Sequence, residues 1–164
     1  ATHTDISECT EQSPIHFITH SMGGILVRYY LNEHSIEQLG RVGMLGPPNK
    51  GSELTDKLKD TPGYSLINGP AGSELGTDSL STPNILGPVD FEVGVIAGNE
   101  TFNPILSTML PNPDDGKVSV ENTKVEGMTD HIEMEVTHTF MMKNEDVIQQ
   151  VLHFLKEGIF KIAS

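Results

Sequence analysis

The sequence is poor in cysteine and has no tryptophan, since Cys9 is the single cysteine among 164 residues. No disulfide can therefore form within the chain, and the cysteine count gives no sign of secretion. No signal peptide is visible, and no run approaches the ~18 apolar residues that span a bilayer. These absences predict a protein without a transmembrane segment, for which the cytoplasm is the default location.

Basic residues are also scarce: 10 Lys and Arg stand against 23 Asp and Glu, which gives a formal net charge of −13. Such a charge repels phosphate backbones, so nucleic acid is not an expected partner. Residues 60–116 contain no Lys or Arg at all. This acidic stretch predicts a solvated surface. If it also borders the functional site, it favours a neutral or cationic substrate over an anionic one.

Short apolar runs indicate strands that alternate with helices. We predict strands at 14–19, 41–45, 91–97 and 131–136, and helices at 23–31 and 145–157. The last helix has the best-defined ends, because Asn144 can cap its start and Gly158 can terminate it. This alternation implies an α/β fold with a mostly parallel sheet flanked by helices.

The chain length allows one domain, spanning residues 1–164. Within it, residues 60–116 are rich in proline and glycine, which predicts loops and short helical turns around the strand at 91–97. We expect residues 60–90 to form a cap or lid over a pocket.

Ser21 lies between a predicted strand and an apolar helix, in the segment Thr19-His20-Ser21-Met22-Gly23-Gly24. A serine hydroxyl is a poor nucleophile unless a tight turn holds it exposed beside a base, and small neighbours such as Gly23 fit a crowded turn. The following helix would start with free backbone N–H groups, which can stabilise an oxyanion. The segment therefore predicts a nucleophilic serine, with the Met22 amide as one oxyanion donor.

Four segments carry a resemblance to a known family: 15–24, 44–52, 114–120 and 136–141. They resemble bacterial lipase- and esterase-type α/β-hydrolases, and the segment around Ser21 is the most specific of the four. In that fold the nucleophile, the acid and the histidine follow one another along the chain. The resemblance implies Ser21 as nucleophile, His138 as base and Asp115 as acid, with Asp114 as the alternative acid.

This resemblance implies a serine hydrolase that cleaves carboxylic esters through an acyl-enzyme, acting on a small-molecule ester or a lipid. No metal or organic cofactor is implied. Two alternatives stay open: a non-catalytic binding protein of the same fold, and an acyltransferase that uses the same three residues. The other histidines are expected to have structural roles, and Arg28 is expected to pair with a buried acid.

The sequence departs from the family in two ways. Thr19 replaces the glycine that usually opens the serine motif, and only about a dozen residues precede the first predicted strand. We therefore expect a partial domain that lacks the N-terminal strands and the second oxyanion donor. The missing half could belong to a longer enzyme, come from another chain, or be lost in an inactive homologue. The start at Ala1 favours a fragment, and an unpaired sheet edge would favour self-association.

Overall fold

Four parallel strands form one sheet in the computed structural model, which describes residues 13–58, 60, 72, 74–101, 108, 110, 111 and 113–161. The strands lie side by side in chain order: β1 (Ile15–His20), β2 (Leu39–Leu45), β3 (Val93–Gly98) and β4 (Asp130–Met134). The predicted parallel sheet is confirmed. The strand predicted at 91–97 begins later, at Val93, and the strand predicted at 131–136 ends earlier, at Met134.

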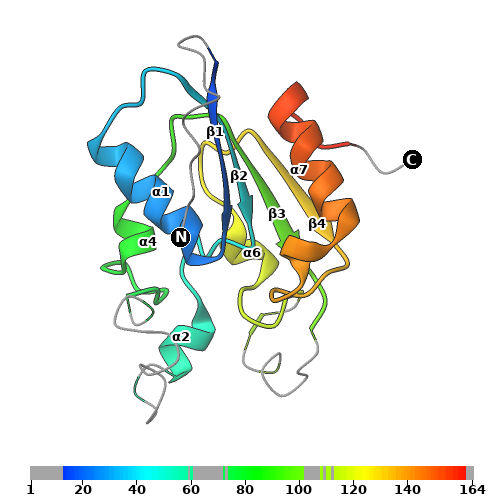
Figure 1. The fold of residues 1–164 in the computed structure, drawn as a ribbon. Helices are drawn as coiled ribbons and strands as arrows, with labels where there is room; N and C mark the ends of the chain where they lie inside the picture. Colours follow the sequence, from blue (N-terminus) through cyan, green and yellow to red (C-terminus); the bar gives the residue numbers. More distant parts are fainter. Residues whose placement is uncertain are drawn as a thin grey trace.

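Helices cover both faces of this sheet (Figure 1). The two long helices that the sequence predicts, α1 (Met22–Glu33) and α7 (Glu145–Glu157), lie on opposite faces. The short helices are α2 (Glu53–Leu58), α4 (Thr82–Ile85) and α6 (Val120–Thr123), and a 3₁₀ turn at Met141–Lys143 precedes α7. None of the helices in the described part of the chain is long and apolar enough to cross a membrane.

The ends of α7 are those that the sequence predicts. The Asn144 side chain accepts hydrogen bonds from the amides of Asp146 (2.9 Å) and Val147 (3.1 Å). Such a cap satisfies amides that have no partner within the helix. At the other end Gly158 has a φ of 83°, a conformation that glycine adopts without strain.

The hydrophobic core has one cluster on each face of the sheet. Leu45 and Ile96 face α7, whereas their neighbours Met44 and Val95 face the other way. Such alternation is the rule along a strand. Phe154 of α7 is fully buried on β3, where a Cβ on Gly94 would lie 2.7 Å from the Phe154 ring. A glycine at this position is therefore what lets α7 pack closely on the sheet.

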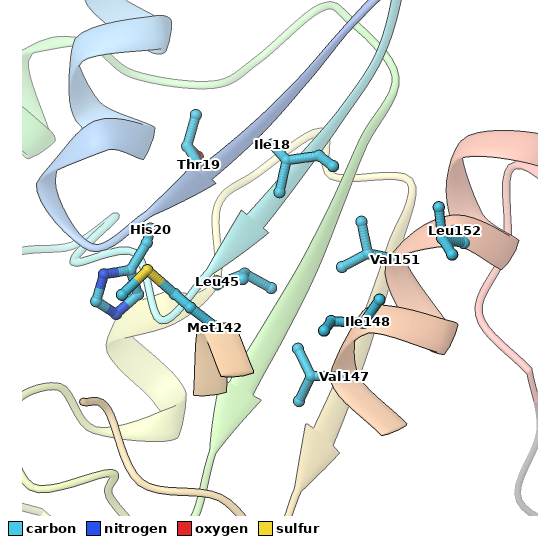
Figure 2. A pocket seen from close by; sticks show the side chains of 9 residues that line it. All are labelled: Ile18, Thr19, His20, Leu45, Met142, Val147, Ile148, Val151 and Leu152. Atoms are coloured by element: carbon cyan, nitrogen blue, oxygen red, sulfur yellow. The ribbon is translucent and has the colours of Figure 1, made fainter. Parts of the chain in front are cut away.

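The outer edge of β1 pairs with no strand among the described residues. Beside it an apolar groove of about 300 Å³ lies between β1 and α7 (Figure 2), and Ile18 in it is 55% exposed. Self-association through this edge stays a prediction. So does the absence of N-terminal strands, since residues 1–12 lie outside the described residues. Part of the predicted cap at 60–90 lies outside them too, namely residues 61–71 and residue 73.

Arg28 ties α1 to two loops on the same side of the sheet. Its guanidinium is buried and donates hydrogen bonds to the carbonyls of Asn49 (3.0 Å), Pro83 (3.0 Å) and Gly87 (2.7 Å). A further bond goes to Oδ1 of Asn49 at 3.1 Å. The prediction of a buried acid as its partner is wrong, because every one of these acceptors is a neutral oxygen. Burial lowers the pKa of Arg28 to about 10.

We predict that Arg28→Met lowers the free energy of unfolding by about 3 kcal/mol, because buried carbonyls would lose charged donors. Urea denaturation of the variant and the parent measures the difference. Lys124→Met is the matched control: it removes an exposed cation that pairs with Glu121, which should cost less than about 1 kcal/mol. Equal losses in the two variants would contradict the structural role of Arg28.

Candidate active site

Ser21 occupies the single residue between β1 and α1 and has an unusual backbone. Its φ of 53° is the one positive φ among the described residues other than glycine. The Ser21 amide donates to the carbonyl of Leu45 at 2.8 Å, which fixes the turn against β2. Non-glycine residues in such conformations cost about 1–3 kcal/mol and concentrate at functional sites. The turn therefore has the sharp strand-to-helix geometry expected for Ser21 from the sequence.

The crowding expected at Gly23 is found at Gly24 instead. A Cβ on Gly23 would make only an ordinary contact, 3.4 Å from the Cβ of Thr19. A Cβ on Gly24 would lie 3.0 Å from the Cβ of Pro47 and 3.2 Å from the sulfur of Met44. Gly24 is thus the residue that lets α1 pack against β2 and the loop after it.

His138 connects Ser21 to Asp115. Its Nε2 lies 3.0 Å from Oγ of Ser21, and its Nδ1 lies 2.7 Å from Oδ2 of Asp115. Because a carboxylate can only accept, Nδ1 donates to Asp115, and in the neutral imidazole Nε2 then accepts from the serine hydroxyl. The structure therefore brings together the three side chains that the sequence singled out, although they lie far apart along the chain.

The Asp115 carboxylate is fully buried and each of its oxygens has partners. Oδ1 accepts hydrogen bonds from the amides of Lys117 (2.9 Å) and Val118 (2.8 Å), while Oδ2 accepts from His138. The alternative acid, Asp114, accepts from the amide of Gly116 at 2.8 Å and so shapes the turn. Of the two acids, Asp115 is the one that orients His138.

His20 supports the backbone of His138. Its Nε2 lies 2.9 Å from the His138 carbonyl oxygen, and the centres of the two rings are 4.7 Å apart. A carbonyl accepts only, so Nε2 of His20 carries a proton. Burial, followed by the neighbouring His138, lowers the pKa of His20 and favours its neutral form. His20 thus holds His138 without placing a second positive charge beside it.

All of these groups meet at the carboxyl end of the sheet. Ser21 follows β1, Gly46 follows β2, Asp115 lies in the segment after β3, and His138 follows β4. The carboxyl ends of parallel strands share one edge, where ligands bind in open α/β sheets. Parallel pairing of the strands is therefore what assembles the site.

Ser21 and Met22 open into a cavity of about 470 Å³. Its lining is mostly apolar, from side chains that include Leu54, Leu58, Leu75 and Val118. Since α1 begins at Met22, the Met22 amide is one of the helix N–H groups without an intrahelical partner. The cavity can therefore hold an apolar group next to the serine hydroxyl.

His16 and His131 have structural surroundings. Nδ1 of His16 accepts from the amide of Arg41 at 2.8 Å. Nε2 of His131 lies 3.1 Å from Oγ1 of Thr123, and burial lowers the pKa of His131. Within the described ranges, no three His, Cys, Asp or Glu side chains come together in a group that could hold a metal ion.

No protein-family model and no curated protein matches the chain. Several solved structures do match it. The mature lipase BlEst2 of Bacillus licheniformis is 18% identical, with a TM-score of 0.69 over 87% of this chain and 66% of that one. Its propeptide form is 19% identical, with a TM-score of 0.70 over 93% and 38%. Phospholipase PlaB from Legionella pneumophila is 17% identical, with a TM-score of 0.59 over 87% and 43%.

These likenesses, together with the parallel sheet flanked by helices, show that the chain has an α/β-hydrolase fold. The predicted fold class is confirmed. The chain spans 66% of the mature lipase and less than half of the other two structures. At such identities the likeness extends to the fold and not to a substrate.

Gly46 is a site residue that the sequence analysis missed. It has a φ of 52°, and a Cβ there would lie 2.9 Å from Oδ2 of Asp115 and 3.1 Å from Nδ1 of His138. Gly46 lies in the segment 44–52, which carries part of the family resemblance. Nothing in the sequence of that segment indicates a contact with Asp115 or His138. Only the assembled sheet brings Gly46 against the Asp115–His138 pair.

We predict that Gly46→Ala pushes Asp115 and His138 apart and weakens the hydrogen bond between them. The NMR signal of the His138 Nδ1 proton should then move upfield or disappear. Gly87→Ala is the matched control, since Gly87 also has a positive φ (65°) but nothing within 4 Å of its Cβ position. Both variants carry backbone strain of about 1–2 kcal/mol. An unchanged His138 signal in Gly46→Ala would contradict the close approach.

Proposed function

We propose that the protein is a serine hydrolase that cleaves carboxylic esters of the lipase and esterase type. The observation that carries this proposal is the chain of contacts from Ser21 through His138 to Asp115, at 3.0 and 2.7 Å. These are hydrogen-bond distances between a nucleophile, a base and an acid in the required order. The lipase and phospholipase folds that match the chain support the same reaction class.

In the proposed reaction His138 takes the hydroxyl proton as the Ser21 oxygen attacks the ester carbonyl. The tetrahedral intermediate carries its negative charge next to the Met22 amide, which donates to it. His138 then gives the proton to the departing alcohol oxygen, and the acyl group stays on Ser21. A water molecule repeats these steps and releases the acid. Asp115 holds the tautomer of His138 throughout and balances its positive charge.

Two features of the surroundings support this assignment over a binding protein without catalysis. Ser21 has a positive φ, a conformation that is strained in a non-glycine residue, and such strain concentrates at functional sites. Asp115 and His138 are both buried, so keeping their polar groups there is costly unless each is paired. An acyltransferase would use the same three residues, and the products formed with and without an added alcohol distinguish it from a hydrolase.

The rest of the enzyme belongs to the same proposal. The chain spans 66% of the mature lipase, so we propose that residues 1–164 are a partial hydrolase domain. Residues 60–90 would cap the cavity beside Ser21, and a small-molecule ester or a lipid would be the substrate. A second oxyanion donor would come from polypeptide outside the described residues.

Turnover of 4-nitrophenyl butyrate tests the proposal. We predict that Ser21→Ala reduces the rate to the level of the uncatalysed reaction, because the attacking oxygen is gone. No difference between Ser21→Ala and the parent would contradict a role for Ser21 in the reaction.

Replacing the two neighbouring acids separates their roles. We predict that Asp115→Asn lowers kcat by about 10²–10⁴-fold, because an asparagine no longer stabilises the His138 cation or its tautomer. Asp114→Asn, which removes the same charge from the adjacent residue, should lower kcat less than about tenfold. The reverse order would assign the acid to Asp114.

A further inference from the structure

Lys117 is the one charged side chain among the described residues that line the cavity beside Ser21. It is also the first basic residue after the acidic stretch 60–116. The remaining lining residues are neutral, and most of them are apolar. The wall of the cavity thus carries a positive charge, although the protein as a whole carries −13.

The backbone of Lys117 is fixed at the site. Its amide donates to Oδ1 of Asp115 at 2.9 Å, and its carbonyl accepts from Oγ of Ser52 at 2.8 Å. The side chain itself is exposed, and no ion pair joins its ammonium to a carboxylate in the described part of the chain. The side chain of Lys117 therefore extends from a fixed backbone, and its ammonium is accessible to a ligand.

Three acids that neighbour lining residues form hydrogen bonds with other groups. On α2, Glu53 accepts a hydrogen bond from the side chain of Asn122 at 2.7 Å. Asp56 accepts from the amide and the hydroxyl of Thr77. Asp115 is bound to His138, as described above. None of these three carboxylates forms an ion pair with Lys117.

Lys117 also acts electrostatically on the catalytic end of the cavity. Burial is the largest cause of the lowered pKa of His20, and the positive charge of Lys117 is one of the smaller causes. Because Lys117 and Ser21 line the same cavity, one substrate molecule can contact both of them.

We propose that Lys117 binds an anionic group of the substrate, so that the site selects esters that combine an apolar chain with a carboxylate, sulfonate or phosphate. This inference rests on the proposed hydrolase function and deepens it. It reverses the expectation from the acidic stretch, which favoured neutral or cationic substrates. At physiological salt the Debye length is about 8 Å, so the charges of distant surface acids are largely screened at the cavity.

Matched pairs of esters test the proposal, and the readout is the ratio of kcat/KM for the anionic ester to that for its neutral partner. One pair places the anion on the acyl side: 4-nitrophenyl hydrogen glutarate and 4-nitrophenyl valerate. The other pair places it on the alcohol side: 4-sulfophenyl valerate and phenyl valerate. We expect Lys117→Met to lower the ratio about tenfold in one of the two pairs, because a charged hydrogen bond is lost. Lys117→Arg should keep most of the parent's preference for the anionic ester.

Lys124→Met is the matched control, since it removes the same charge from a surface lysine paired with Glu121. Its ratios should equal those of the parent. Ratios that stay unchanged in Lys117→Met for both pairs would overturn the proposal. Equal losses in Lys117→Met and Lys124→Met would also overturn it, because they would reflect net charge alone.

Binding to the Ser21→Ala protein separates this inference from the hydrolase function. In an NMR titration, monoethyl glutarate should bind more tightly than diethyl glutarate, and adding Lys117→Met should abolish the difference. That result together with an absence of ester turnover in the parent would contradict the hydrolase but support the anion site. Equal binding of the two esters to Ser21→Ala would overturn the anion site, whatever the turnover.

Discussion

The buried carboxylate of Asp115 is the group on which the rest of the site depends. Two backbone amides and His138 satisfy it, which is the condition for keeping a charge away from water. The same contacts fix the loop after β3, the orientation of the His138 ring and the backbone of Lys117. The Asp115 carboxylate, the proposed acid, thereby joins the proposed base His138 and the proposed substrate contact Lys117 into one unit.

That unit also constrains the sheet. The loops that carry Ser21, Asp115 and His138 meet only because the strands before them run parallel and end at the same edge. Gly46 must remain a glycine for the Asp115–His138 pair to fit against β2. Arg28 holds the loops around Asn49 and Gly87 to α1, on the side of the cavity. The packing around the sheet and the geometry of the candidate site therefore depend on the same few close contacts.

Much of the fold follows from local sequence signals. The alternation of apolar runs predicts the four strands, and the cap at Asn144 with Gly158 predicts the ends of α7. The residues of the site were recognisable because Ser21 stands between a strand and a helix, and because the resemblance supplies the order of its partners. Contacts between segments distant in the sequence were not predictable. Gly46, the neutral partners of Arg28 and the place of Lys117 on the cavity wall depend on how the loops fold back together.

Covalent labelling with a fluorophosphonate probe tests the central claim most directly, because it needs an activated serine but no particular substrate. Proteolysis and mass spectrometry then locate the label. We expect one label per chain, on Ser21, that forms rapidly in the parent and much more slowly in His138→Ala. A folded parent that takes no label, or a label that persists in Ser21→Ala, would contradict it.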